Sequence, residues 1–258
     1  MSQAFQTAGD VRMACRVGEL TGPTTGYAAG YEQANLVIVP KEFAFDFLLF
    51  CHRNSRACPL LDVTDIGDPE PKRSTAGADL RTDLPKYRVW RDGRVSDEPT
   101  NLRELWRDDL VSFLIGCSFT FEHALLAEGI PVRHLEQGRN VPMFNTGLEC
   151  QAAGRFAGPL VVSMRPMLPM QALAASKICE RFPRSHGGPI HVGDSSAIGI
   201  HDITKPDYGD PVDIRPGELP VFWACGVTPQ AALMRAKLPF AITHAPGHMF
   251  LTDLRSGT

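Results

Sequence analysis

The stretch that decides the fold lies near the C-terminus. It runs Leu219-Pro-Val-Phe-Trp-Ala-Cys-Gly226, then Thr228-Pro-Gln-Ala-Ala-Leu-Met-Arg-Ala-Lys237, then Phe240-Ala-Ile-Thr-His244. The first and third segments are short and apolar, as buried strands are. In the middle segment, threonine at the N-cap and proline at the first helical position indicate the start of a helix. The pattern predicts a β-α-β crossover whose two strands are parallel.

The N-terminal part shows the same alternation. Asn35-Leu-Val-Ile-Val-Pro40 is continuous, β-branched and ended by proline, which predicts a buried strand. It leads directly into Glu42–Arg53, where apolar side chains recur at helical spacing. A strand followed at once by a helix is typical of α/β proteins, so we expect that fold class.

The middle of the chain predicts a smaller inserted layer. Leu102–Glu128 suits one or two helices with Gly116 as the break, and Val132–Glu136 suits a strand. Further strands near residues 140–144 and 158–165 and a helix over 169–181 complete an α+β block. We therefore expect a three-layer α/β main domain, residues 1–104 plus 184–258, carrying an inserted two-layer α+β subdomain, residues 105–183.

Composition narrows the class of partner. The chain has 258 residues, 43% of them hydrophobic and 21% charged, with a formal net charge of −3. Such a balance favours neither nucleic acid nor an anionic membrane surface as a partner. The seven scattered cysteines are expected to be reduced thiols, and the N-terminus lacks the pattern of a signal peptide. The expected location is the cytoplasm.

Residues that can carry chemistry collect at the ends of the predicted strands, where open α/β sheets bind ligands. One strand end brings His191 and Asp194, the second Cys225 and Gly226, and the third His244. Each also has a structural interpretation, since a thiol in an apolar strand is commonly a core residue. A divalent metal held among His191, Asp194, His201, Asp202 or His244 is left open, because their spacing is not diagnostic.

Several segments resemble the bacterial family named hydro-lyases, which is related to mammalian D-glutamate cyclase. The matching text covers nearly the whole chain and includes Phe50-Cys-His-Arg-Asn54, Gly116-Cys-Ser-Phe-Thr-Phe-Glu122, His186-Gly-Gly-Pro-Ile-His-Val-Gly-Asp194, Pro220-Val-Phe-Trp-Ala-Cys-Gly-Val-Thr-Pro-Gln230 and Ile242-Thr-His-Ala-Pro-Gly247. The resemblance implies a main domain with an insertion, and a carbon–oxygen lyase acting on a small amino or hydroxy acid. The leading hypothesis for the reaction is the cyclisation of D-glutamate to 5-oxo-D-proline and water.

That chemistry needs a base, an acid, an oxyanion site and a carboxylate site. Our assignments by placement are His191 or His244 as the base, with Asp194 or Asp207 orienting it or acting as the acid. The expected substrate contacts come from Arg81, Arg165, Cys225, Gly226 and Thr228, the last two by amides at a helix start.

Two other functions remain open: a metal-assisted dehydratase of a hydroxy acid, and a non-catalytic binder of metabolites related to oxoproline. The cofactor is left open as Mn²⁺, Mg²⁺ or none, and no nucleotide cofactor is expected. The expected ligand is a small carboxylate, and the expected assembly is a homodimer.

Overall fold

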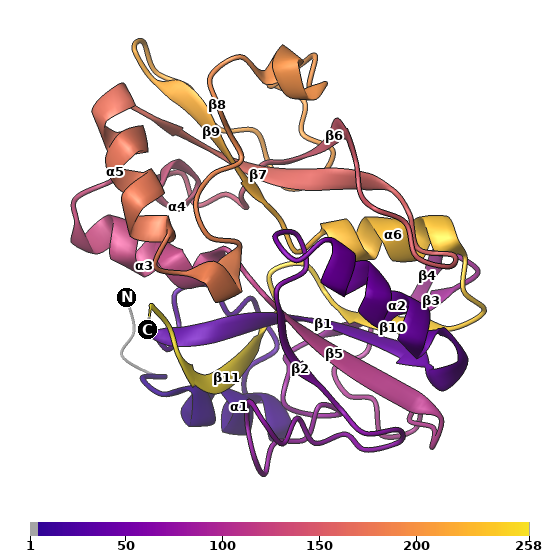
Figure 1. The fold of residues 1–258 in the computed structure, drawn as a ribbon. Coiled ribbons are helices and arrows are strands. Elements are labelled where there is room, and N and C mark those ends of the chain that lie inside the picture. Colours follow the sequence, from indigo (N-terminus) through magenta and orange to yellow (C-terminus); the bar gives the residue numbers. More distant parts are fainter. Residues whose placement is uncertain (1–4, 258) are drawn as a thin grey trace.

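A computed structural model describes residues 5–257 as two β-sheets with helices packed on them (Figure 1). The larger sheet consists of β1 (Tyr31–Pro40), β2 (Leu60–Val63), β3 (Tyr87–Arg91), β4 (Arg94–Asp97), β5 (Leu110–Gly116), β10 (Ala241–His244) and β11 (Phe250–Arg255). Its order is β2-β5-β1-β10-β3-β4, and β11 also pairs with β1. The smaller sheet consists of β6 (Met143–Glu149), β7 (Pro159–Met167), β9 (Leu219–Ala224) and β8 (His191–Val192), in that order.

The helices lie around and between these sheets (Figure 1). They are α1 (Ala8–Arg16), α2 (Lys41–Arg53), α3 (Phe119–Ala127), α4 (Arg133–Glu136), α5 (Pro169–Cys179) and α6 (Thr228–Ala236), with short 3-10 helices η1 (Pro183–Ser185) and η2 (Ser195–Ile198). The chain thus combines helices and sheets, which confirms the α/β class in this general sense. The assignment of three layers to one domain and two to another stays a prediction.

The predicted pair of Asn35–Pro40 and Glu42–Arg53 is confirmed as β1 and α2. β1 is buried along nearly its whole length, because β5 flanks it on one side and β10 and β11 on the other. Helix α2 turns Phe47 and Phe50 inward, and Phe47 meets the ring of Phe113 edge-on at 4.8 Å. Side chains from β1, α2, β5 and α6 together form one hydrophobic cluster.

Two predictions in the middle of the chain are wrong. Residues 110–116, expected within a helix, form β5 of the larger sheet, and helix begins only at Phe119. All seven residues of β5 are buried, so the apolar run has no polar face, and its pattern does not distinguish a strand from a buried helix. Val132–Glu136, expected as a strand, contains the short helix α4, whose Arg133 and His134 are buried.

The predicted parallel crossover is also wrong. β9 pairs with β7 and β8 in the smaller sheet, whereas β10 pairs with β1 and β3 in the larger one. Every pairing in both sheets is antiparallel. Helix α6 therefore passes from one sheet to the other, and the rule for parallel crossovers does not apply because the strands do not share a sheet.

The division of the strands between the two sheets does not follow the predicted boundaries of the insertion, residues 105 and 183. β5 lies within the expected insertion but belongs to the larger sheet, while β8 and β9 lie outside it but belong to the smaller sheet. The smaller sheet therefore takes strands from both sides of residue 183. The separation into two domains itself stays a prediction.

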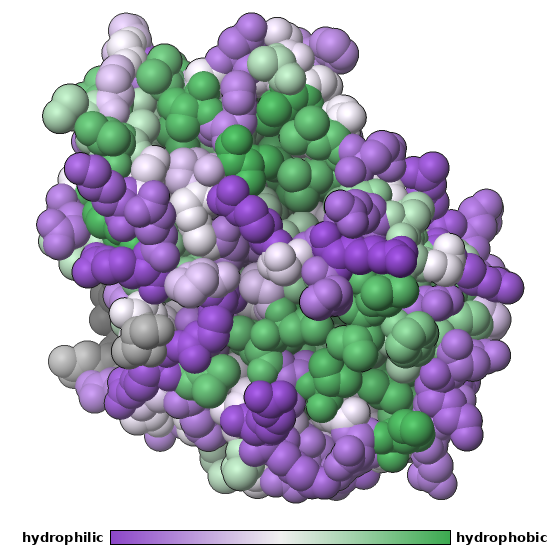
Figure 2. All heavy atoms as spheres, viewed as in Figure 1, coloured by the Kyte–Doolittle hydropathy of each residue, from purple (hydrophilic) through white to green (hydrophobic). Residues whose placement is uncertain are grey.

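The face seen in Figure 2 carries two areas of apolar residues, one over each sheet, with polar residues between them. Large apolar side chains exposed on the smaller sheet include Leu148, Val192 and Leu219. Within residues 5–257, no helix has both the length and the apolar character needed to cross a membrane.

Candidate active site

A cavity of about 610 Å³ lies where the two sheets approach each other. Its walls come from β1, from the β3–β4 hairpin and from the end of β10 in the larger sheet. The opposite wall comes from residues 140–143, residues 208–209, the end of β9 and helix α6. The volume is in the range of sites that hold a small molecule.

Two junctions between a strand and a helix face this cavity. Cys117, Ser118 and Phe119 join β5 to α3, and residues 225–227 join β9 to α6. The first N–H groups of a helix have no partner within it, so each junction offers donors to an anionic group. The two helix starts therefore place partial positive charge on opposite walls.

Both cysteines at these junctions have thiols whose pKa is raised by burial. Burial raises the pKa of Cys225 to about 11, and it raises the pKa of Cys117 well above its ordinary value. The N–H groups of Phe119 and Val227 act against burial, each lowering the pKa of the thiol two residues before it. The positive charge of Arg165 lowers both pKa values as well.

His244, at the end of β10, is buried with its ring against the backbone of Leu36. Its Nδ1 lies 3.1 Å from the backbone nitrogen of Leu36 and 3.4 Å from the carbonyl oxygen of the same residue, so Nδ1 accepts from the N–H in one tautomer and donates to the oxygen in the other. Burial lowers the pKa of His244 to about 4, so the ring is neutral near pH 7. Its Nε2 lies 3.4 Å from the side-chain amide of Gln230, which also lines the cavity.

The structure brings together some of the residues predicted from sequence. Cys225, Gly226 and His244 line the cavity. Thr228 lies directly behind the wall, where its Oγ1 accepts a hydrogen bond from the N–H of Val161 at 3.0 Å.

Three other predicted residues lie outside the set that lines the cavity. Asp207 is exposed, and its carboxylate accepts a hydrogen bond from the N–H of Asn145 at 2.8 Å. His191 lies on β8, with Nε2 2.6 Å from the carbonyl oxygen of Asp194. Asp194 caps η2 through its side chain and is exposed.

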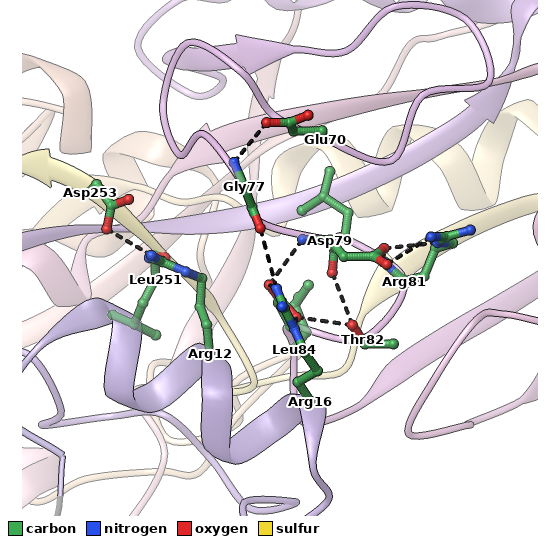
Figure 3. Close-up of polar contacts among 12 residues, drawn as sticks. Arg12, Arg16, Glu70, Gly77, Asp79, Arg81, Thr82, Leu84, Leu251 and Asp253 are labelled. Atoms are coloured by element: carbon green, nitrogen blue, oxygen red, sulfur yellow. Dashed lines mark hydrogen bonds and ion pairs between the residues drawn. The ribbon is translucent and has the colours of Figure 1, made fainter.

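The two arginines predicted to bind substrate both have carboxylate partners within the protein. Arg165 is fully buried, pairs with Glu122, and donates a hydrogen bond to the Oγ of Ser118 at 3.2 Å. Since Ser118 lines the cavity, Arg165 stands one side chain behind the wall. Arg81 lies away from the cavity lining and binds Asp79 through two hydrogen bonds of 2.8 Å, as Figure 3 shows.

Glu122 lies at the centre of this buried charged group. Burial alone would raise its pKa, but the positive charge of Arg165 and the interaction with His134 lower the pKa below its ordinary value. His134 Nε2 is 3.3 Å from the Glu122 carboxylate. The group fixes Ser118, and with it the wall beside Cys117.

Sequence reasoning missed the cations on the cavity wall, Arg88 and Arg94 of the β3–β4 hairpin. Arg88 Nε lies 2.6 Å from Glu98, whereas Arg94 is exposed and forms no ion pair within residues 5–257. No Asp or Glu is among the described residues that line the cavity. Neither arginine stands out in the sequence, but Asn35, a polar residue in an apolar strand that also lines the cavity, is a signal that could have been used.

The candidate metal ligands do not form a metal site. In the part of the chain that the structure describes, no group of three or more His, Cys, Asp or Glu residues is arranged to hold a metal ion. His244 is buried, while Asp194, His201 and Asp202 are exposed. These residues therefore do not fit a shared divalent ion.

The family model and the similar proteins point to the same family. The D-glutamate cyclase family model matches residues 111–253. Proteins named "Putative hydro-lyase" from Bacillus licheniformis and Geobacillus kaustophilus are each 59% identical over 246 residues, covering 95% of this chain and 94% of theirs. One of the same name from Streptomyces coelicolor is 61% identical over 236 residues, covering 92% of this chain and 85% of its own.

Among solved structures, a nitrogen repressor-like protein from Methanococcus jannaschii matches with a TM-score of 0.40 and 11% identity. The match covers 98% of this chain and 100% of that one. No conclusion follows from a likeness of this size.

Proposed function

Because the chain belongs to the D-glutamate cyclase family, we propose that it is a hydro-lyase that converts D-glutamate to 5-oxo-D-proline and water. The observation that carries this proposal is the charge of the cavity wall. Arg88 and Arg94 line it, and none of the described lining residues is a carboxylate. A wall of this charge favours an acidic ligand, and a cavity of about 610 Å³ accommodates one the size of glutamate.

In this reaction the α-amine attacks the carbon of the γ-carboxyl group, and a tetrahedral intermediate loses a hydroxyl as water. Negative charge develops on the former carbonyl oxygen, which requires donors already in place. The Nε2–H of His244 is suited to that role in the tautomer in which Nδ1 accepts from the N–H of Leu36, because the neutral ring then carries its proton on Nε2. The amides of Gly226 and Val227 supply further donors from the opposite wall.

The α-carboxylate of the substrate then faces the hairpin. Arg94 has no competing carboxylate within residues 5–257, so it is the cation best able to pair with the substrate. Arg165 has a different role in this scheme: it positions Ser118 and adds positive charge behind the wall, because Glu122 already occupies it.

The test is turnover of D-glutamate and of 5-oxo-D-proline by the purified protein, followed by chiral chromatography in both directions, with the L-enantiomers as controls. His244→Asn is the informative variant, because an asparagine oxygen can replace Nδ1 as the acceptor for Leu36 while the Nε2–H donor is lost. We expect kcat to fall by about 10²–10³-fold, the usual effect of removing one such donor.

His248→Asn is the matched control, since His248 lies four residues further along and outside the cavity lining. We also expect His191→Gln to leave turnover unchanged, because of its place on β8. Binding of D-glutamate by calorimetry without any product would overturn the lyase and favour a metabolite-binding protein. Turnover of a hydroxy acid but not of glutamate would favour the dehydratase.

A further inference from the structure

The two junctions that face the cavity are one structural unit present twice. Each reads Cys-x-x-Thr, as Cys117-Ser-Phe-Thr120 and Cys225-Gly-Val-Thr228. In both, the carbonyl oxygen of the cysteine accepts a hydrogen bond from the N–H of the threonine, at 3.1 Å and 3.0 Å. In both, the cysteine is the first residue after a strand, β5 or β9. The helix that follows, α3 or α6, begins within the next three residues.

The two threonines make equivalent contacts. Thr120 Oγ1 accepts a hydrogen bond from the N–H of Gln33 on β1, and Thr228 Oγ1 accepts one from the N–H of Val161 on β7. Both distances are 3.0 Å. In each sheet the donor lies on the strand next to the one that ends at the cysteine: β1 lies next to β5, and β7 lies next to β9.

The strand registers agree as well. In the larger sheet Gly116, the residue before the first cysteine, is opposite Ala34. In the smaller sheet Ala224, the residue before the second cysteine, is opposite Val162. In each case the amide that binds the threonine belongs to the residue just before this partner. The correspondence therefore covers two strands, a junction and a helix start in each sheet.

The two units meet at the cavity. Gly226 packs on the side chain of Asn35, so closely that a Cβ on Gly226 would lie 2.0 Å from Asn35 Nδ2. The same Nδ2 donates a hydrogen bond to the carbonyl oxygen of Gly116 at 2.9 Å. Cys225 directly precedes Gly226 and Cys117 directly follows Gly116, and both cysteines line the cavity.

Equivalent groups on two walls suit a reaction whose two ends are equivalent. Ring closure of glutamate needs an acid and a base in unlike positions, whereas inversion at a carbon removes a proton from one face and adds one to the other. We propose that Cys117 and Cys225 form an acid–base pair that removes and returns the α-hydrogen of a bound acidic amino acid, exchanging it with solvent and interconverting the two enantiomers. This activity rests on the proposed function only for the choice of amino acid.

The step balances without a further reactant. One cysteine, as thiolate, takes the α-hydrogen as a proton, and the electron pair of the broken C–H bond stays on the α-carbon and spreads into the adjacent carboxyl group. The thiol of the other cysteine gives its proton to the opposite face, forming the new C–H bond and a new thiolate. Nothing is oxidised or reduced, and proton exchange with water restores the starting state.

Positive charge opposes the effect of burial on the pKa of both thiols. Burial raises the pKa of both thiols, which disfavours the thiolate form. Arg165 lowers both pKa values, and the ammonium group of a bound amino acid adds a second positive charge. The exchange rate should therefore rise with pH above neutrality.

The experiment follows deuterium at the α-carbon. The wild-type protein is incubated in D₂O with D-glutamate, L-glutamate, 5-oxo-D-proline or 5-oxo-L-proline, and the recovered compounds are examined by proton NMR and chiral chromatography. We expect α-deuterium and the opposite enantiomer from at least one of the four. Cys117→Ser and Cys225→Ser should each slow interconversion by about 10²–10⁴-fold, the usual contribution of a general acid or base.

Cys150→Ser is the control, because this partly exposed cysteine lies outside the cavity lining. Should either serine variant fail to fold, the corresponding Cys→Ala variant replaces it. Absence of α-deuterium from all four compounds, or exchange at the wild-type rate in both variants, overturns the proposal. Cyclisation without α-exchange overturns it and leaves the proposed function standing. Exchange without cyclisation supports it and removes the cyclase assignment.

Discussion

Replacing Gly226 with alanine should disturb the contact between the two sheets at its closest point. The added Cβ would lie 2.0 Å from Nδ2 and 2.4 Å from Cγ of Asn35, well inside contact distance. Gly226 is not among the glycines with a left-handed backbone, so the added carbon has only a steric effect. Asn35 is 3% exposed, and moving its side chain away from Gly226 displaces the amide that binds the end of β5.

The size of the loss in stability follows from the hydrogen bonds that the side chain of Asn35 makes. Its Nδ2 donates hydrogen bonds to the carbonyl oxygens of Gly116, at 2.9 Å, and Ile115, at 3.2 Å. Displacement would leave buried polar groups without partners, each at a cost of about 1–3 kcal/mol. Overpacking of a filled region adds a cost of similar size. We expect Gly226→Ala to lower the free energy of unfolding by roughly 2–5 kcal/mol.

Urea denaturation followed by circular dichroism measures this loss. Gly22→Ala is the control, because a Cβ there meets no atom within 4 Å and its backbone is not left-handed. The double variant Asn35→Ala/Gly226→Ala removes the clash. Its loss in the free energy of unfolding should therefore be smaller than the sum of the losses in the two single variants, by about 1 kcal/mol or more. Equal stability of Gly226→Ala and Gly22→Ala would refute the reasoning.

Three more predictions concern charge. Glu122→Gln leaves Arg165 buried without a carboxylate and should lower the free energy of unfolding by about 3–5 kcal/mol; a loss below about 1 kcal/mol would contradict this. His186 and His244 both have a pKa lowered by burial to about 4, from 6.5. The unfolded state therefore binds protons first, and stability should fall as the pH drops from 6.5 towards 4, as read from the urea midpoint, and less so in either His→Gln variant. Arg94→Gln should raise the KM for D-glutamate about tenfold with little change in kcat, and the difference should shrink in high salt.

Elements defined by local pattern could be predicted from the sequence. β1 is a β-branched apolar run ended by Pro40, and α2 has its apolar residues on one face, so both are specified by their own residues. β5 is equally apolar but was predicted as a helix, since burial on both faces removes the alternation that identifies a strand.

Strand partners depend on contacts that no local pattern contains. β9 and β10 are separated by one short helix, which is the usual spacing within a sheet, yet they lie in different sheets. The distinction arises because β9 meets β7 and β10 meets β1, strands that are far apart in the sequence.

The candidate site was predictable to a similar extent. Cys225 and Gly226 were found because a strand end followed by a helix start is visible locally. Cys117 was a weak nucleophile candidate in the sequence, but it was not placed beside Cys225 because the segment before it was predicted as a helix. Arg94 reaches the cavity only through the pairing of the hairpin with β10, and nothing in its own neighbourhood indicates that.

The division of strands between the two sheets also affects when each sheet can form during synthesis of the chain. β1, at the centre of the larger sheet, has β10 and β11 as neighbours, and the smaller sheet needs β9 to join β7 and β8. Neither sheet can be completed before its later strands have left the ribosome, so β1 and β7 wait for partners that are synthesised well after them. Many of the contacts are then distant in sequence, which favours slow folding and a period of exposed apolar strands during synthesis.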